Sequence, residues 1–327
     1  GGGGGAWGAG AARGAGGGVA GGGGRVGERS SGGGAIAIAG NQGKTPTTHM
    51  LGQVLTAAGF DPSVLVGDGH SNRAGHSSWL VAEADESDGS LVLHHPAYAI
   101  VTNIELDHHD HFADLATVRE VFQRFVSQVR ELSVICADDA EAMLLEVPGR
   151  RVTYGLREGD YTAAQLGISL TVPGRHNLLN ATGVAALALE LGVSPNVVRK
   201  TLAAFTGAHR RMEFIGTWKG VPLYDDYGHH PTEIRATLQA ARELAPKRVI
   251  LVFQPHRYTR LAALLEDFAG AIKGADAAIV TEVYAAGEEP NGASAVQLAE
   301  KVPGARFAPP FDTVKDARSG LVQPRAL

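Results

Sequence analysis

Short apolar runs alternate with helical segments from Ala35 onward, and this alternation constrains the fold more than any other feature of the chain. Strands that alternate with helices form a mainly parallel sheet with helices packed on its faces. The predicted strands are 35–39, 64–66, 79–84, 97–103, 132–136, 221–226, 248–253 and 277–284. The predicted helices are 46–58, 117–129, 178–191, 195–205, 231–244, 261–273 and 294–301. The predicted fold class is therefore α/β.

The length of 327 residues is sufficient for two domains. Residues 1–34 are more than half glycine, and such a segment cannot bury enough apolar surface to offset the entropy lost on ordering. We interpret 1–34 as a low-complexity segment. Two adjacent helical segments end before 207–211, and a new series of strands and helices follows. We therefore predict a central domain at 35–211 and a C-terminal α/β domain at 212–327.

The composition favours a protein that acts on a small molecule. The chain is 44% hydrophobic and 19% charged, and its net charge of −5 comes without a long basic run, which argues against a nucleic-acid surface. Cys136 is the only cysteine, so one chain can form neither a disulfide framework nor a cysteine-based zinc site, as suits a reducing cytoplasm. The sequence has no apolar stretch of about 18 residues and no signal-peptide pattern at its start, so we expect no membrane insertion.

A glycine-bearing turn, AGNQGKTPTT at 39–48, joins the first predicted strand to the first predicted helix. The general phosphate-loop pattern G-x-x-x-x-G-K-[ST] needs a glycine where this chain has Ile38, so an ordinary strand-to-helix turn is an equal alternative. In a phosphate loop, Gly40 and Gly43 would let the backbone approach phosphate oxygens. Lys44 would contact the phosphates, and Thr45 would offer its hydroxyl to Mg²⁺.

Two polar clusters follow predicted strands, at the edge where doubly wound sheets bind ligands. The acidic cluster EADESD at 83–88 suits Mg²⁺, which prefers oxygen ligands, although a solvated acidic turn is the alternative. The cluster TNIELDHHDHF at 102–112 concentrates histidine and aspartate. Its composition is compatible with a zinc or dinuclear hydrolase site or with a second Mg²⁺ held by one histidine, and does not choose between them.

Three further segments carry polar groups beside predicted helix starts. In VPGRHNLLNATG at 172–183, Asn177 and Asn180 share one helix face and could bind a polar ligand or cap the helix. YDDYGHHPTEI at 224–234 brings two acids and two histidines to a helix start. In FQPHRYTR at 253–260, Arg257 and Arg260 could bind one anion or be ordinary surface arginines.

Taken together and in this order, these segments resemble the ATP-dependent Mur ligases, most closely the alanine-adding branch, over roughly residues 35–315. The family's G-T-x-G-K-T-T-T loop matches AGNQGKTPTT at both glycines, at the lysine and at all but one threonine of the helix start. The departures are Asn41, Gln42 and Pro46. The resemblance implies a central phosphate-loop domain with a mainly parallel sheet and a Rossmann-like C-terminal domain. Family members begin with a further domain that binds the UDP group, and here 1–34 stands in its place.

The resemblance also implies a role for each matching residue. Lys44, His108 and Arg211 are the predicted catalytic residues, and Thr45, Glu83 and His108 are the predicted Mg²⁺ ligands. The predicted ATP-binding residues are Gly40, Gly43, Lys44, Thr45, Thr47, Asn177, Asn180, Arg211 and Asp226. The predicted substrate-binding residues are His229, Arg257 and Arg260.

The implied activity is a cytoplasmic, bacterial amide-bond synthesis that uses ATP and Mg²⁺, with UDP-N-acetylmuramate and L-alanine as substrates. A carboxylate is phosphorylated by ATP, and the acyl phosphate is then attacked by the amine. We expect a monomer or a homodimer, without nucleic acid as a partner. The alternatives are a murein-tripeptide ligase of the same family and an ATP-binding paralogue without ligase activity.

Overall fold

The structure is a computed structural model that describes residues 34–67, 71–87, 89–108 and 111–308. A seven-stranded sheet has the order β2-β3-β1-β4-β5-β6-β7, and every neighbouring pair is parallel. Its strands are β1 (Ala35–Ala39), β2 (Ser63–Leu65), β3 (Leu80–Ala84), β4 (Tyr98–Val101), β5 (Leu132–Cys136), β6 (Arg150–Gly155) and β7 (Tyr161–Thr162). In such a sheet the loops that follow the strands gather at one edge.

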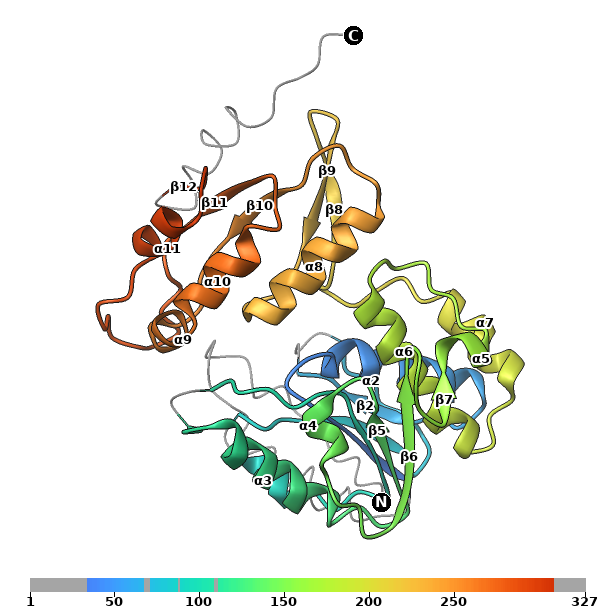
Figure 1. The fold of residues 1–327 in the computed structure, drawn as a ribbon. Coiled ribbons are helices and arrows are strands. Elements are labelled where there is room, and N and C mark those ends of the chain that lie inside the picture. The colour runs from blue at the N-terminus through green and yellow to red at the C-terminus, as the bar shows by residue number, and fades with distance from the viewer. Residues whose placement is uncertain (1–33, 68–70, 88, 109–110, 309–327) are drawn as a thin grey trace, which may run out of the picture.

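Helices cover both faces of this sheet (Figure 1). One face packs against α2 (Lys44–Ala57), α6 (Arg175–Glu190) and α7 (Pro195–Ala203), and the other against α3 (Leu115–Val126). The shorter elements are η1 (Ser90–Leu93), α4 (Ala140–Met143) and α5 (Ala163–Leu166).

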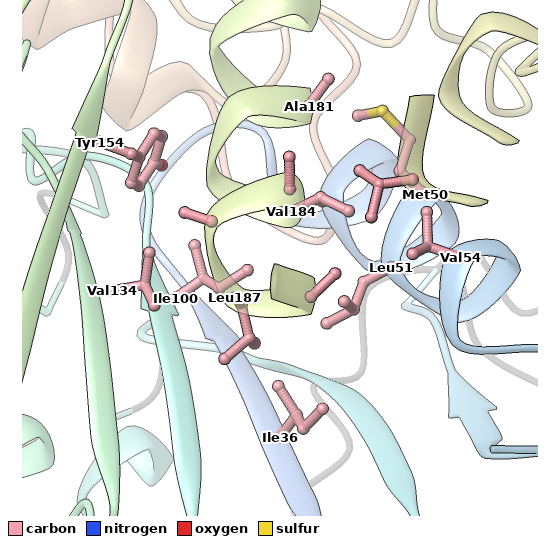
Figure 2. Close-up of a cluster of buried hydrophobic side chains, with 14 of the residues drawn as sticks. Ile36, Met50, Leu51, Val54, Ile100, Val134, Tyr154, Ala181, Val184 and Leu187 are labelled. Carbon is pink, nitrogen blue, oxygen red and sulfur yellow. The ribbon is translucent and has the colours of Figure 1, made fainter. Parts of the chain in front are cut away.

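The alternation of isoleucine and alanine in β1 shows why the sheet is buried on both faces. Successive side chains of a strand point to opposite faces, so Ile36 and Ile38 join the core beneath α2 and α6, whereas Ala37 and Ala39 join the core beneath α3. Figure 2 shows Ile36 in the first of these cores, with Leu51 of α2 and other apolar side chains of α6 and the sheet around it.

The C-terminal elements form a smaller α/β unit, coloured from golden yellow to red in Figure 1. Strands β10 (Ile250–Phe253), β11 (Ala277–Val280) and β12 (Arg306–Phe307) form a parallel sheet, while β8 (Glu213–Trp218) and β9 (Val221–Asp225) form an antiparallel hairpin. The helices are α8 (Pro231–Glu243), α9 (Tyr258–Ala263), α10 (Leu265–Ile272) and α11 (Ala295–Lys301). Side chains of α8, α10 and α11 share one apolar core with β10 and β11.

The α/β fold class is confirmed, and the predicted strands at 35–39 and 132–136 coincide with β1 and β5. The strand predicted at 277–284 ends at Val280, and the helix predicted at 261–273 is interrupted at Leu264. Strand β6 was not predicted because it begins with two arginines, and β8 was not predicted because a glycine interrupts it.

The boundary placed at Arg211 stays a prediction, as does the low-complexity segment at 1–34, which except for Gly34 lies outside the described residues. None of the described helices combines the length and the apolar character needed to span a membrane.

Candidate nucleotide and ligation site

The glycine turn lies at the carboxyl edge of the seven-stranded sheet, between the end of β1 and the start of α2. Gly40 and Gly43 have φ angles of 142° and 82°, which L side chains rarely adopt. A Cβ on Gly40 would overlap the hydroxyl of Thr102, and one on Gly43 would lie 2.7 Å from Asn180 Oδ1. Among the described residues no side chain caps the N-terminus of α2, so its N–H groups are available to bind an anion.

The turn is fastened to the segment that follows β4. Gln42 N donates to Asn103 Oδ1 at 2.8 Å, and Thr102 Oγ1 donates to Gln42 O at 2.6 Å. Glu105 N donates to Asn41 Oδ1 at 2.8 Å. Of the residues that depart from the pattern of the loop, Asn41 holds the turn through its side chain, whereas Gln42 contributes only its backbone N–H and C=O.

Lys44 lies at the mouth of this turn. Its Nζ donates to Gly40 O at 2.7 Å and to Glu86 Oε2 at 2.5 Å, and lies 3.7 Å from Asp85 Oδ1. Burial opposes the charge of Lys44, but Glu86 and Asp85 outweigh it and raise its pKa above the ordinary value. Burial raises the pKa of Glu86 to about 7 although Lys44 opposes that shift. A phosphate bound to Lys44 would therefore replace Glu86, a carboxylate whose ionisation is opposed by burial.

Glu83 is the last but one residue of β3 and lies near Thr45 at the start of α2. The hydroxyl of Thr45 and the backbone of Gly67 lie close enough to its carboxylate to favour ionisation, but burial outweighs them and raises its pKa. Its Oε1 atom is buried and has no hydrogen-bond partner among the described residues. An unpartnered carboxylate oxygen next to a hydroxyl is the kind of oxygen pair that Mg²⁺ binds.

His108 lies close to two carboxylates. Its Nε2 atom is 3.7 Å from Glu86 Oε1 and 3.9 Å from Asp107 Oδ2. Burial lowers the pKa of His108, which favours the neutral imidazole that binds metals. Its φ angle of 54° is unusual for a residue with a side chain and often marks a functional position.

The other members of the DHHDH cluster, His109 and Asp110, lie outside the described residues. Within the part of the chain that the structure describes, no three His, Cys, Asp or Glu side chains gather as metal ligands. The described side chains by themselves therefore supply no complete cage of the kind that holds structural zinc.

Three of the predicted nucleotide-binding residues, Thr47 of α2 and Asn177 and Asn180 of α6, are buried. Asn180 lies against Gly43, directly behind the turn. Asn177 Nδ2 donates to Pro173 O at 2.7 Å, a bond from its amide back to the preceding turn. The N-cap of α6 is Gly174, so Asn177 does not cap this helix. The hydroxyl of Thr47 is fully buried and has no partner among the described residues.

Arg211 and Asp226 lie where the C-terminal unit begins. Arg211 Nη1 donates to Glu233 Oε1 at 2.9 Å, while Asp226 accepts from Met212 N at 2.9 Å. Glu233 also accepts from His229 N at 2.8 Å. Burial opposes the ionisation of Glu233, but His229 and Arg211 hold its pKa at about 2. The charge of Arg211 lowers the pKa of Glu83, so this cluster lies near the phosphate loop.

Arg260 is bound inside the protein. Its Nε and Nη2 atoms donate to Asp107 at 2.9 and 3.2 Å, and its Nη1 donates to His256 O at 3.3 Å. The Arg260 side chain is only 4% exposed. Arg257 instead lies 3.7 Å from Glu288. The two arginines thus have separate carboxylate partners, and their predicted role in holding one substrate anion stays a prediction.

Sequence reasoning did not assign roles to four residues that supply carboxylates around the predicted site, namely Glu86, Asp107, Glu105 and Glu233. All four lie inside the motif strings quoted from the sequence. Their position near assigned residues in the sequence could have marked them as candidates. A motif does not show which carboxylate contacts which basic side chain.

Two family profiles match the chain, that of the Mur ligase middle domain at residues 38–188 and that of the Mur ligase, glutamate ligase domain at residues 210–326. The UDP-N-acetylmuramate--L-alanine ligase of Solibacter usitatus is 42% identical over 298 residues, covering 82% of this chain and 63% of that relative. The chain belongs to the Mur ligase family.

Other Mur ligases support this assignment. The UDP-N-acetylmuramate--L-alanine ligase of a Synechococcus strain is 42% identical and covers 88% of this chain and 66% of its own length. The crystal structure of UDP-N-acetylmuramate-alanine ligase MurC from Thermotoga maritima has a TM-score of 0.70 at 28% identity, covering 86% of this chain and 68% of that one. MurF from Acinetobacter baumannii shares the fold, with a TM-score of 0.72, 20% identity and coverage of 91% and 72%. The chain spans 63% to 66% of the length of these two curated relatives.

Proposed function

We propose that this chain is an ATP-dependent ligase that joins L-alanine to UDP-N-acetylmuramate during peptidoglycan precursor synthesis and releases ADP and phosphate. The proposal is supported by curated relatives of that name at 40% to 42% identity. The observation that carries it is the ion pair between Asp107 and Arg260, because it brings the C-terminal unit against the phosphate-loop edge. A two-substrate reaction is accelerated when both reactants are held in one geometry, and this junction brings groups of both units together.

The donor atoms at the phosphate loop fit Mg²⁺. Glu83 Oε1 is buried without a partner among the described residues, and the Thr45 hydroxyl lies beside the same carboxylate. We propose Thr45 and Glu83 for a first Mg²⁺ and His108 for a second. Bound there, the metal would neutralise charge on the phosphates of ATP.

In the first step, the lactyl carboxylate of the sugar attacks the γ-phosphorus of ATP, and the bond to the ADP oxygen breaks. Lys44 and the N–H groups at the start of α2 hold the phosphates during this transfer. Asn177 and Asn180 of α6, with Arg211 and Asp226, are the proposed nucleotide contacts. The product of this step is an acyl phosphate.

In the second step, the amine of L-alanine attacks the acyl carbon, a proton leaves the nitrogen, and phosphate departs as the amide forms. We propose His229 and Arg257 as groups that hold the muramoyl or amino-acid end of the substrate, the role that the family resemblance also gives to Arg260. Contact between the C-terminal unit and the sheet edge keeps water from the acyl phosphate, which would otherwise hydrolyse. We place this reaction in the bacterial cytoplasm, where ATP is available and Cys136 stays reduced.

The test is phosphate release from ATP with UDP-N-acetylmuramate and L-alanine each present or omitted, together with detection of the amide. Release that requires both substrates is expected. Turnover with a murein tripeptide but not with L-alanine would assign the chain to tripeptide recycling. ATP binding without substrate-dependent release would identify a paralogue that has lost ligase activity.

A further inference from the structure

Asp107 accepts hydrogen bonds from two different parts of the molecule. Its Oδ1 accepts from Arg260 Nε at 2.9 Å and from the backbone N–H of His108 at 2.7 Å. Its Oδ2 accepts from Arg260 Nη2 at 3.2 Å and lies 3.9 Å from His108 Nε2. One carboxylate therefore joins the C-terminal unit to the backbone of His108 and lies beside its ring.

This pair is isolated from water, and it depends on the position of the C-terminal unit. The side chains of Asp107 and Arg260 are each 4% exposed, although they lie 153 residues apart in the chain. Although burial opposes ionisation of Asp107, Arg260 and His108 hold its pKa below the ordinary range. Removal of either partner would leave a buried charge without compensation.

The backbone conformation of His108 depends on its contact with Asp107. Its φ of 54° is a conformation that a residue with a side chain adopts only when its surroundings hold it there. The bond from His108 N to Asp107 Oδ1 is such a restraint. Carboxylates that orient metal-binding histidines also tune metal affinity.

We propose that Asp107 and Arg260 are positioning residues that couple docking of the C-terminal unit to the orientation of His108, so that the second metal site is complete only in the docked arrangement. The inference rests on the proposed function, because it takes His108 as a metal ligand. Arg260 acts through Asp107 and not by direct contact with a reacting atom.

The test is titration of Mn²⁺ into the full chain loaded with a non-hydrolysable ATP analogue, followed by calorimetry and electron paramagnetic resonance. The variants are Asp107→Asn, Arg260→Gln and the double variant. Each single variant is expected to weaken the weaker of the two Mn²⁺ affinities 10–100-fold, with no further loss in the double variant. The tighter site at Glu83 should stay unchanged.

A matched control is Arg119→Gln. It breaks the ion pair between Arg119 Nη1 and Glu141 Oε2, which are 2.7 Å apart and belong to other elements than this cluster. It should leave both Mn²⁺ affinities at the wild-type values. Arg260→Lys keeps the charge but loses the planar fork, so an intermediate Mn²⁺ affinity is expected, and it replaces Arg260→Gln if that variant does not fold. Unchanged affinity at the weaker site, or additive losses in the double variant, would overturn the proposal.

Neither UDP-N-acetylmuramate nor L-alanine is needed in this titration. Coupled Mn²⁺ losses in a chain that forms no amide would refute the ligase function and leave the coupling between Asp107 and Arg260 standing. Normal ligation together with unchanged Mn²⁺ binding in the variants would refute the coupling between Asp107 and Arg260 and leave the ligase function standing.

Discussion

Asn180 of α6 lies directly against Gly43 of the phosphate loop, so close that a Cβ on Gly43 would come 2.7 Å from Asn180 Oδ1. Because Gly43 also has a φ of 82°, both its backbone conformation and its surroundings exclude a side chain. The part of α6 that carries Asn180 and the loop are thus fitted to one another.

Replacement of Gly43 by alanine should reduce the free energy of unfolding more than the same change at Gly59. Gly59 has a similar φ of 86° with nothing within 4 Å of an added Cβ, so Gly59→Ala measures backbone strain alone, about 1–2 kcal/mol. The excess loss in Gly43→Ala should be relieved in the double variant with Asn180→Ala. Urea unfolding measures these differences, and equal losses at the two glycines would contradict the fit.

Replacement of Lys44 by methionine should lower the rate of ATP-dependent amide formation by about 10²–10³-fold, because a charge that stabilises the transferring phosphoryl group is lost. The control is Lys273→Met, at an exposed position after α10. Steady-state turnover with saturating substrates is the measurement. An unchanged rate in Lys44→Met would refute the role of Lys44.

Replacement of Glu83 by glutamine should raise the Mg²⁺ concentration needed for half-maximal activity by about tenfold or more, because the amide removes a charged oxygen ligand and keeps the shape of the side chain. Glu282→Gln, at an exposed carboxylate beyond β11, serves as the comparison. Should the two Mg²⁺ titrations of activity coincide, Glu83 is not a ligand.

The stability of the protein should depend on the ionisation of Glu105. Burial raises its pKa to about 7 from an ordinary value of 4.5, so the folded state holds a proton that the unfolded state releases. The stabilisation linked to this proton is complete below about pH 4.5 and is lost as the pH rises through 7. Glu105→Gln, which cannot ionise, should therefore gain stability relative to the wild type at high pH.

Urea unfolding at pH 5 and pH 8 measures this effect, and the difference between wild type and Glu105→Gln should change by about 2–3 kcal/mol between them. Glu300→Gln, at an exposed position of α11, should show no such change. A constant difference between wild type and Glu105→Gln would show that Glu105 titrates normally.

Local sequence patterns predicted the fold class because they reflect interactions within one strand or helix. Strand β5 is apolar apart from Ser133, and its bounds were predicted correctly. Strand β6, which begins with two arginines, is defined by its pairing with β5 and was not predicted. The two short helices α9 and α10 carry one continuous apolar pattern, so the interruption at Leu264 was invisible in the sequence.

The sequence alone determined the strand, turn and helix of the phosphate loop, because glycines at fixed spacing and the apolar run before them act over a few residues. The sequence also placed acids, histidines and arginines directly after predicted strands, where the carboxyl ends of parallel strands lie. Only the tertiary structure decided that Arg260 binds Asp107, that Lys44 binds Glu86 and that Asn41 and Gln42 fasten the loop. Those partners lie 42 to 153 residues apart, so packing of separate elements, and not local pattern, selects them.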